Sequence, residues 1–478
     1  MKIKNFLFFQ FLIFAFYSRA QSPGDNDSLF NSGVGADQRI SESKLQNDGS
    51  IIICGSFVNY NGMPVKYLAR LDGNGNLDTT LNIGTGPNSY LYSTLSQKDG
   101  KLIITGNFSS FNNTQIFSIA RLNSDGSLDN TFNPKLGPDK AINCMSLQSN
   151  GKIIVSGSLK KYNNKDARDI ARINTDGRLD TTFKSGQGVG GFITPGGQPY
   201  ISKSEILGNG KIIIAGIFYI YDTISRPSIA RLNTNGSLDL TFEPKLPSGS
   251  QVNDFAIQSD GKIVISGSFT KNGGNQFDYL RRLNENGSID TSFKPQIGVD
   301  DRPEVVAIQK DGKIVVGYSK FFNNAFPRSI IRLNADGSLD SSFNVGAGPD
   351  SFISNLLIQE DEKIIVSGSF TKFNNLSRGR ITRLNGGTIS GIRDLSANDD
   401  ELLVYPNPTT GIIQMQSKYP IQQIIIFNLL GETVYETPKQ QNIDFNPYID
   451  ISGLRNGVYF LQVRANGRVA TKKIVVMH

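Results

Sequence analysis

The stretch Ala120-Arg-Leu-Asn-Ser-Asp-Gly-Ser-Leu-Asp-Asn-Thr-Phe132 decides the fold, because close copies of it recur along most of the chain. Its middle predicts a β-hairpin with a three-residue loop at Ser124–Gly126, in which the glycine takes the left-handed position. The hairpin places Arg121 opposite Asp129 on one face and leaves the leucine beside each of them on the other face. One repeat therefore carries both an aliphatic face and a charged face.

The stretch occurs seven times, with the last copy cut short, at intervals of 50 or 51 residues and once of 59. Individual copies vary at one or two positions, but each keeps its arginine: Arg70, Arg121, Arg172, Arg231, Arg282, Arg332 and Arg383. A second phrase, typified by Gln258-Ser-Asp-Gly-Lys-Ile-Val-Ile-Ser-Gly267, precedes every copy, and its relatives start at Gln46, Gln97, Gln148, Leu207, Gln309 and Gln359. Self-similarity at a fixed period predicts a repeat architecture.

Each repeat predicts four short β-strands. The first ends at the start of the second phrase, an Asp-Gly or Asn-Gly turn usually follows, and the second strand is rich in β-branched residues. A polar loop, often Phe-Asn-Asn or Tyr-Asn-Asn, leads to the third strand at Ala-Arg-Leu-Asn, and Leu-Asp-x-x-Phe forms the fourth. Because nothing between residues 21 and 401 has a helical period, we predict an all-β chain whose body is a seven-bladed β-propeller. An open β-solenoid is the rival architecture, but its repeats are usually shorter.

The two ends of the repeat region predict ring closure. The seventh repeat stops at Leu384-Asn385 and lacks its own Leu-Asp-x-x-Phe strand. The segment Asp27-Ser-Leu-Phe30 closely resembles Asp340-Ser-Ser-Phe343 of the sixth repeat. We therefore expect the N-terminal strand to complete the last blade, which would tie the two ends of the body together.

The recurring arginine and aspartate predict a cross-strand ion pair in every blade. The aspartate lies eight residues after the arginine in all complete copies, and Asp27 would meet Arg383 in the closing blade. A ring of charged functional sites is the alternative, but a pair repeated in every copy indicates scaffold. The expected structural pairs are Arg70–Asp78, Arg121–Asp129, Arg172–Asp180, Arg231–Asp239, Arg282–Asp290, Arg332–Asp340 and Arg383–Asp27.

The two phrases resemble the delta-60 repeat family of bacterial β-propeller-like proteins. The resemblance rests on Asp-Gly-Lys-Ile-Val-x-x-Gly and Ala-Arg-Leu-Asn-x-Asp-Gly-Ser-Leu-Asp-x-x-Phe, and it covers residues 21–390. It implies a repeat scaffold on exported proteins. It implies no settled activity and no catalytic residues.

Residues 1–20 are predicted to be a cleaved secretory signal peptide. Lys2 and Lys4 precede a short apolar run at 5–17, and small residues stand at the key positions before Ala20. A membrane anchor is the alternative, but the run is too short to span the bilayer as a helix, and no later stretch is long and apolar enough to do so.

A second domain is predicted at 404–478, after a linker at 391–403. It has several short strands with turn signals, which suggests a small immunoglobulin-like β-sandwich. The segment resembles the type A C-terminal sorting domain of the type IX secretion system, which implies export through the periplasm to the cell surface or medium, removal of the domain, and the secretion machinery as a partner. An ordinary immunoglobulin-like module is the alternative. The residues that carry the resemblance include Tyr405, Pro406, Asn407, Pro408, Gly457, Tyr459, Lys472 and Lys473.

Composition excludes several kinds of chemistry. The only histidine is His478 and there is no tryptophan, so the body has no Ser-His-Asp system and no histidine-ligated metal site. The formal charge of +7 falls to about +1 over residues 21–401, without a basic cluster, so we expect no nucleic-acid partner. Cys54 and Cys144 lie in different repeats and are expected to be free thiols.

Candidate ligand-binding residues come from the irregular parts of the repeats. The 59-residue interval contains an insertion near 184–200, and a repeat that departs from its neighbours often does so in a binding loop. A tolerated surface insertion is the alternative, and the variant loop Phe321–Arg328 is a further candidate of the same kind. The Asn-x-Asp-Gly-x-Leu-Asp turns have too few carboxylates for calcium, so we expect no metal and no cofactor. The candidate residues are Phe192, Gln198, Tyr200, Asp300, Asp301 and Arg302.

The sequence favours an exported, non-enzymatic binding scaffold that acts as a monomer on an extracellular glycan or protein ligand. A polysaccharide-degrading hydrolase or lyase that uses carboxylates is the main alternative, and a purely structural exoprotein is the third. Unpaired acids that converge on the ring's axial pocket, outside the repeated pairs, would favour the enzyme. A polar pocket or an exposed aromatic patch would favour binding.

Overall fold

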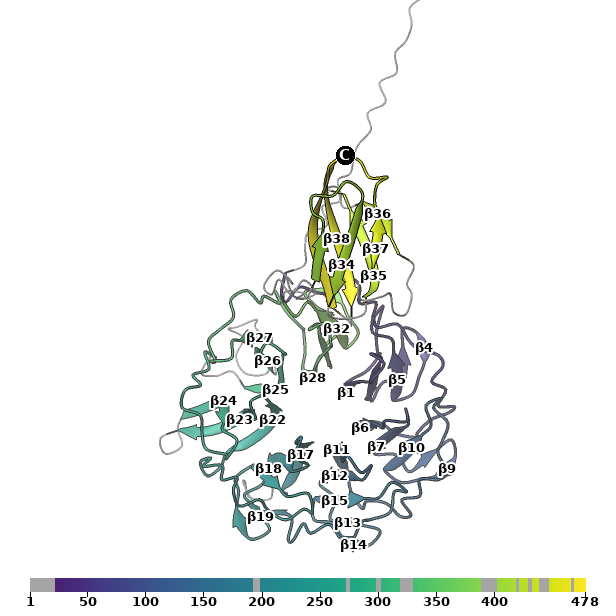
Figure 1. Cartoon of the computed structure of the whole chain (residues 1–478). Helices are drawn as coiled ribbons and strands as arrows, with labels where there is room; N and C mark the ends of the chain where they lie inside the picture. Colours follow the sequence, from purple (N-terminus) through teal and green to yellow (C-terminus); the bar gives the residue numbers. More distant parts are fainter. Residues whose placement is uncertain are drawn as a thin grey trace, which may run out of the picture. The chain divides into compact units, whose positions relative to one another are not determined.

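The computed structural model describes residues 22–191, 198–271, 276–297, 302–318, 330–387, 402–417, 421–428, 432–437, 447–465 and 468–478. Every regular element in these ranges is a β-strand (Figure 1). None of the described segments forms a helix that is long and apolar enough to cross a membrane. Apart from the turn Glu360–Glu362, the first compact unit ends at Asn385 and the second begins at Gly386. The predicted signal peptide and most of the predicted linker lie outside the described residues, so these boundaries stay predictions.

Each repeat forms one antiparallel three-stranded sheet, which we call a blade and number in chain order. The middle strand of the blades is built from runs such as Ile-Ile-Val, which suit a strand buried on both faces. The blades are β1 (Ile40–Leu45), β2 (Ile51–Gly55) and β5 (Leu68–Leu71); β6 (Leu91–Ser96), β7 (Leu102–Gly106) and β10 (Ile119–Leu122); β11 (Ile142–Leu147), β12 (Ile153–Gly157) and β15 (Ile170–Ile173); β17 (Tyr200–Ile206), β18 (Ile212–Ile217) and β21 (Ile229–Leu232); β22 (Gln251–Ile257), β23 (Ile263–Lys271) and β24 (Gln276–Leu283); β25 (Pro303–Ile308), β26 (Ile314–Tyr318) and β27 (Ile330–Leu333); β28 (Ile353–Ile358), β29 (Ile364–Gly368) and β32 (Ile381–Leu384).

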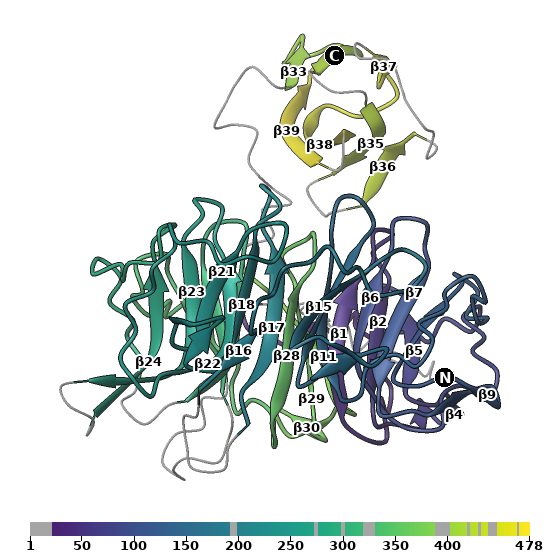
Figure 2. The same ribbon diagram turned by 90° about the horizontal axis from the view of Figure 1, so that it is seen from below.

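The blades form a closed ring, which confirms the predicted seven-bladed propeller. The first strand of each blade contacts the first strand of the next, and β28 of blade 7 returns to β1 of blade 1. Figure 1 looks along the axis of this ring, and Figure 2 shows the same blades from the side. The core lies between blades: Ile52 and Cys54 pack on Leu102 and Ile104 of blade 2, while Ile53 packs towards blade 7.

The expected fourth strand is reduced to a single β-bridge. In blade 2 only Leu122 and Leu128 pair, and the same bridge recurs in the other complete repeats. The cause is the aspartate that follows: Asp129 Oδ1 accepts the backbone N–H of Thr131 at 2.9 Å, which turns the chain before a strand can continue. Gly126 takes φ +93° in the turn between the bridge partners, as the hairpin requires.

The polar loop after the second strand contains a short hairpin that the sequence did not predict. Asparagines such as Asn112 and Asn113 adopt left-handed φ values and turn two-residue strands back on each other. In blade 4, β16 (Val189–Gly190) joins this hairpin. The hairpins are β3 (Asn59–Tyr60) with β4 (Met63–Pro64), β8 (Ser110–Phe111) with β9 (Thr114–Gln115), β13 (Lys161–Tyr162) with β14 (Lys165–Asp166), β19 (Ile220–Tyr221) with β20 (Ile224–Ser225), and β30 (Lys372–Phe373) with β31 (Leu376–Ser377).

The N-terminal segment closes blade 7, as predicted. Asn26 bridges Leu384, and the backbone N–H of Asp27 donates to the carbonyl of Arg383 at 2.8 Å. The N–H of Asn385 donates back to the carbonyl of Asp25 at 2.8 Å. The beginning and the end of the propeller are thus joined by one β-bridge at the outer edge of blade 7, in the same place as the bridges of the complete repeats.

A charged cluster sits at the outer strand of each blade, and blade 2 shows its full form. Asp129 Oδ2 accepts from Arg121 Nε at 2.7 Å and from Lys101 Nζ at 2.8 Å. The guanidinium lies over the ring of Phe132, with its central carbon 4.9 Å from the centroid. Its Nη1 donates to the carbonyl of Thr175 in blade 3 at 2.6 Å. The arginine therefore links its own hairpin to the neighbouring blade.

The cluster repeats around the ring with nearly constant geometry. The distance from arginine Nε to aspartate Oδ2 is 2.6–2.8 Å in the pairs Arg70–Asp78, Arg121–Asp129, Arg172–Asp180, Arg231–Asp239, Arg282–Asp290, Arg332–Asp340 and Arg383–Asp27. The inter-blade bonds run from Arg70 to Ser124, Arg121 to Thr175, Arg172 to Thr234, Arg231 to Glu285, Arg282 to Ala335 and Arg383 to Gly73.

Blade 1 has a weaker version of this cluster. Ser50 stands where the other repeats have the lysine, and Leu81 replaces the phenylalanine. The side chain of Asp78 is 28% exposed, compared with 4% for Asp129. The guanidinium of Arg70 keeps its bond to the next blade, at 3.0 Å to the carbonyl of Ser124. In blade 1 the arginine alone therefore pairs with the aspartate and links the blade to the next one.

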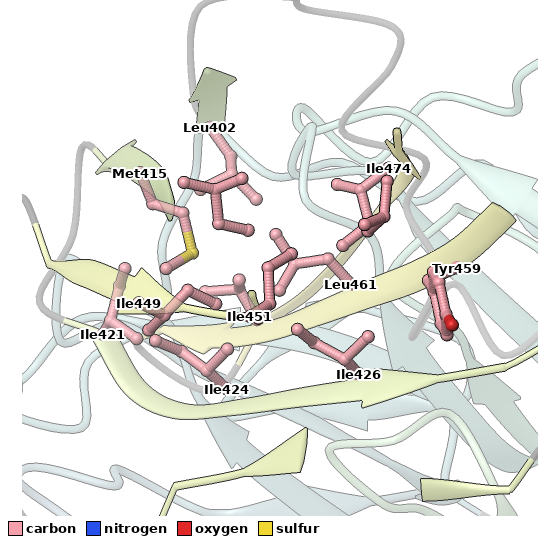
Figure 3. Packing of buried hydrophobic residues seen from close by; sticks show 13 residues of the cluster. Leu402, Met415, Ile421, Ile424, Ile426, Ile449, Ile451, Tyr459, Leu461 and Ile474 are labelled. Carbon is pink, nitrogen blue, oxygen red and sulfur yellow. The ribbon is translucent and has the colours of Figure 1, made fainter. Parts of the chain in front are cut away.

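The second unit is a small β-sandwich, as predicted. One sheet contains β33 (Leu402–Tyr405), β34 (Ile412–Ser417) and β37 (Tyr448–Asp450), and the other has the order β36 (Thr433–Glu436), β35 (Ile421–Phe427), β38 (Gly457–Ala465) and β39 (Arg468–Val476). Aliphatic side chains from both sheets meet in one core, which Figure 3 shows around Met415, Ile424 and Leu461. Alternating inward residues on two antiparallel sheets are what such a fold requires.

Replacing Asp27 by alanine should destabilise the whole propeller. The change leaves the buried Arg383 and the partly buried Lys363 without their shared anion, and breaking a buried ion pair typically costs about 3–5 kcal/mol. Urea unfolding followed by circular dichroism measures the loss of free energy of unfolding. The neighbouring exposed variant Asp25→Ala is the control and should change stability little. A change at Asp27 no larger than the control would contradict the assigned role in closure.

Acid should weaken the ring through the repeated aspartates. Burial alone would raise the pKa of Asp129, but hydrogen bonds from Lys101, Thr131 and Arg121 lower it below the ordinary value. Because the pKa of these aspartates is lower in the folded than in the unfolded chain, their ionised form stabilises the fold. This contribution is complete above about pH 5 and is lost as pH falls below about 4, where the unfolded chain takes up protons first. Urea midpoints at pH 7, 5 and 3 test this: the first two should be similar and the third clearly lower. Equal midpoints at all three would be inconsistent with ionised clusters. The other depressed groups are Asp27, Asp78, Asp180, Asp239, Asp290 and Asp340.

Candidate functional site

A pocket of about 800 Å³ lies at the ring axis and is lined by the first strands of the seven blades. Within the described parts of the chain these strands have no ladder partner on their inner edge, since β1, β6 and their equivalents are the innermost strands of their sheets. Each first strand also has a register shift near its start, such as the one between Ile40 and Glu42. A shift of this kind re-aims the side chains that follow it, which brings polar groups to the axis.

The residues at the axis differ from blade to blade, although the blades share one scaffold. The equivalent position in each blade is the first residue of the first strand after the register shift. In blade 1 this residue is Glu42, which pairs with Cys54 of the second strand. All of these residues except Ser93 line the pocket. In blade order they are Glu42, Ser93, Cys144, Lys203, Asp254, Val305 and Asn355.

Blades 4 and 5 place a lysine between carboxylates. Lys203 Nζ lies 2.7 Å from Asp254 Oδ1 and donates to the carbonyl of Phe255 at 2.6 Å. Asp254 Oδ2 accepts the backbone N–H of Val306 in blade 6 at 2.9 Å. The carboxylate of Glu205, which lines the pocket, has no hydrogen-bond or ion-pair partner within the described parts of the chain. Its burial raises its pKa, Lys203 opposes the shift and Asp254 adds to it.

Blade 6 contributes a second carboxylate with a raised pKa. Glu304 Oε2 is 3.3 Å from Asn253 Nδ2. Burial raises the pKa of Glu304, and the Arg302 guanidinium opposes the shift. Tyr200, at the start of β17, has its own pKa raised by burial and by the charge of Glu304. Glu304 therefore lines the same side of the pocket as Asp254, and Tyr200 and Arg302 lie close enough to Glu304 to affect its charge or be affected by it.

Blades 7, 1 and 2 supply the opposite side, where charges are paired and aromatic rings are available. Glu42 lies 3.0 Å from Lys44 and accepts the backbone N–H of Thr94 at 2.7 Å. Arg39 Nε donates to Ser354 Oγ at 3.3 Å.

Two aromatic side chains of this side line the pocket. Tyr92 packs edge-on against the ring of Tyr90, with centroids 5.4 Å apart, and Phe352 is 36% exposed. An apolar ring beside amide and hydroxyl groups is the combination found in many small-ligand sites.

The structure divides the six predicted ligand-binding residues. Tyr200 begins β17 and Arg302 directly precedes β25, so both stand at the ends of first strands near Glu304. Gln198 is exposed just before β17. Phe192, Asp300 and Asp301, and the loop Phe321–Arg328, lie outside the described residues.

Sequence reasoning missed Glu205, Glu304, Asp254, Tyr92 and Phe352. The sequence has many acids and aromatics, and none of these five lies in an insertion. Aligning the first strands of the seven repeats would have found them, because these strands vary where the later phrases are constant. Variation inside a repeat array was therefore a usable signal for the pocket.

The described residues hold no group of three or more His, Cys, Asp or Glu side chains placed to bind a metal ion. The turn aspartates, which superficially suggest calcium loops, already have partners. Asp125 Oδ1 accepts from the N–H of Ser127 at 2.9 Å and from its hydroxyl at 2.7 Å. The carboxylate stabilises the turn.

The residues of the predicted sorting motif lie in the β-sandwich. Asn407 Nδ2 donates to the carbonyl of Lys473 at 2.7 Å, and the N–H of Val475 donates to Asn407 Oδ1 at 2.9 Å. Tyr459 is buried, and its hydroxyl donates to the carbonyl of Arg455 at 2.9 Å. The motif thus fixes the turn before β34 to the last strand. Gly457 begins β38, Lys472 and Lys473 lie in β39, and Tyr405, Pro406 and Pro408 lie in or after β33.

Two family models match the chain. A β-propeller family described as a domain of unknown function (DUF5122) matches residues 46–81, 97–132, 148–183, 207–242, 258–293, 309–343 and 359–386. The secretion system C-terminal sorting domain matches residues 403–477. No curated protein matches the chain.

Several solved structures resemble the chain at low identity. One is PorZ, described as an essential bacterial surface component of the type-IX secretion system of Porphyromonas gingivalis, with 12% identity and a TM-score of 0.44; the match covers 93% of this chain and 60% of PorZ. Another is the GH74 xyloglucanase from Xanthomonas campestris, with 9% identity and a TM-score of 0.40 over 92% of this chain and 80% of the xyloglucanase. A PL25 ulvan lyase has 12% identity and a TM-score of 0.32 over 62% of this chain and 78% of the lyase. Likenesses at this level carry no argument about activity.

The two cysteines should differ in reactivity, which reports on access to the pocket. Both are free; Cys54 is buried, whereas Cys144 is partly exposed and lines the pocket. Burial raises the pKa of both thiols, so labelling should be slow and should accelerate as pH rises. A thiol reagent should modify one cysteine in the folded chain and two in urea, and Cys144→Ser should abolish labelling of the folded chain. Labelling of Cys54 in the folded chain would contradict this assignment.

Proposed function

The chain belongs to the DUF5122 β-propeller family, and from this premise we propose that it is an exported protein whose axial pocket binds a glycan. Its C-terminal sorting domain directs it through the type IX secretion system to the cell surface or the extracellular space. Beyond this localisation, we propose where the protein binds its ligand and to which class the ligand belongs.

The observation that carries the proposal is a contrast between two parts of the blade. The outer strands are nearly identical in all blades, whereas the residues that line the axial pocket differ from blade to blade. The outer Arg–Asp pairs keep their separations within 0.2 Å around the ring, from 2.6 to 2.8 Å. At the pocket, one register position holds acid, base, thiol, amide and aliphatic side chains in different blades. A scaffold needs the first feature, and a specific ligand site needs the second.

The lining favours a sugar over an apolar ligand. Asn143, Asn253 and Ser354 offer amide and hydroxyl groups that can both donate and accept hydrogen bonds. Tyr92 and Phe352 offer ring surfaces beside them, on which the apolar face of a sugar can stack. A sugar presents hydroxyl groups at its edge and C–H groups on its faces, so it uses both kinds of lining.

A second candidate is a carboxylate-based polysaccharide-degrading enzyme, which one observation favours. Glu205 and Glu304 have raised pKa values. They lie in the same pocket as Asp254, which forms an ion pair with Lys203. A protonated acid near an ionised one is the arrangement that glycoside hydrolysis uses. The body has no histidine to serve as the base.

A glycan array with the purified chain, followed by titration calorimetry, tests the proposal. Tyr92→Ala and Phe352→Ala should each weaken binding of the ligand found by about tenfold, because each removes one stacking surface. Met63→Ala, an exposed residue on an outer hairpin, is the matched control and should bind as the parent does. Equal loss in the control, or none in the pocket variants, would contradict axial binding. Release of reducing ends from the bound glycan would favour the enzyme.

A further inference from the structure

The charges that line the axial pocket are unevenly distributed among the blades. The first strands of blades 4, 5 and 6 contribute three carboxylates, Glu205, Asp254 and Glu304, and one ammonium group, Lys203. The first strands of blades 7, 1 and 2 contribute Glu42 with Lys44, and Arg39 adds a cation beside them. The side formed by blades 4–6 is therefore the acidic side of the pocket.

We infer that the pocket takes an amine-bearing sugar, with its ammonium group facing the carboxylates of the acidic side. The inference rests on the proposed glycan binding and adds the charge of the ligand. It commits to a glycan because the same pocket carries aromatic surfaces and amide groups, which a lysine side chain of a peptide would leave unused.

The lysine on the acidic side does not neutralise all three carboxylates. Lys203 is bound to Asp254 at 2.7 Å and to the carbonyl of Phe255 at 2.6 Å, and its ammonium group also lies over the ring of Phe255, 4.9 Å from the centroid. The ammonium group of Lys203 is therefore already bound by residues of blade 5. Glu205 and Glu304 are left without an ion pair among the residues that the structure describes.

The two remaining carboxylates are in an environment that disfavours their charge. Burial is the largest cause of the raised pKa of both Glu205 and Glu304. The groups that face Glu205 are Lys203 and Asp254, and those that face Glu304 are Arg302, Tyr200 and Asn253. A cation that enters the pocket would offset the cost of burying these charges, whereas an acidic sugar would add to it.

Binding of defined oligosaccharides to the full chain tests the inference. Oligomers of glucosamine carry the amine, oligomers of N-acetylglucosamine have the same backbone without the charge, and oligogalacturonate is the acidic counterpart. At mildly acidic pH, where the amine is protonated, glucosamine oligomers should bind at least about tenfold more tightly than the N-acetylated ones. Their affinity should fall as pH drops through the carboxylate pKa values, because the protonated acids no longer attract the ammonium group.

Matched variants locate the effect. Glu205→Gln and Glu304→Gln keep side-chain size and should each weaken binding of the glucosamine oligomer by about tenfold, with little change for the N-acetylated oligomer. Glu243→Gln, which changes an exposed acid outside the pocket, is the control and should have no effect. Circular dichroism of each variant shows that the fold is kept.

The outcomes separate this inference from the proposed function. Preference for the N-acetylated or the acidic oligomer, with binding still lost in Tyr92→Ala, would overturn the amine-bearing ligand and leave glycan binding in place. Tighter binding of a lysine-rich peptide than of any sugar would overturn both. Loss on Glu205→Gln and Glu304→Gln, confined to the amine-bearing oligomer, supports the inference.

Discussion

The fold depends on one interaction, in which an arginine holds an aspartate of its own blade and a carbonyl of the next. Arg121 binds Asp129 through Nε and the carbonyl of Thr175 through Nη1, so one planar group fixes both the hairpin register and the seam between blades. Lysine could not do both, because its single ammonium group lacks the fork geometry of the guanidinium. The same contact recurs from Arg70, Arg172, Arg231, Arg282 and Arg383, so it joins neighbouring sheets around most of the ring.

Placing this cluster at the outer strand leaves the inner strand free to vary. The middle strand is buried between neighbouring blades and must stay aliphatic, as Ile52 and Ile104 do across one seam. The first strand has an unpaired edge at the axis, so its polar residues can face solvent or a ligand. Stability and recognition therefore occupy different strands of the same blade, which is why one register position can carry a different side chain in every blade, six of them in the lining of the pocket.

Much of the fold could be predicted from the sequence because the repeat supplies the same information seven times. The spacing of Arg121 and Asp129 predicted the hairpin register, and the likeness of Asp27–Phe30 to Asp340–Phe343 predicted the closing strand. The length of the fourth strand could not be predicted, because it depends on Asp129 accepting the N–H of Thr131, a contact between near neighbours that competes with the ladder. The short hairpins were missed because Asn-Asn was interpreted only as a polar loop.

The pocket was less predictable than the fold, for a physical reason. A candidate such as Tyr200 stands out because it lies at an insertion, but Glu205 and Glu304 become meaningful only when the ring brings β17 and β25 to one side of the axis. Distances between blades are set by ring closure, which no local pattern contains. Once the blades are aligned, the irregular positions of the first strand mark the site.

The free energy of unfolding of Arg121→Lys tests the central claim most directly. The variant keeps a positive charge beside Asp129, but a single ammonium group cannot also hold the carbonyl of blade 3. If the arginine joins the blades, the loss should be about 2–3 kcal/mol, the size expected when hydrogen bonds to a charged group are broken. An unfolding free energy equal to that of the parent chain would show that the seams do not depend on this contact, and the account would be wrong.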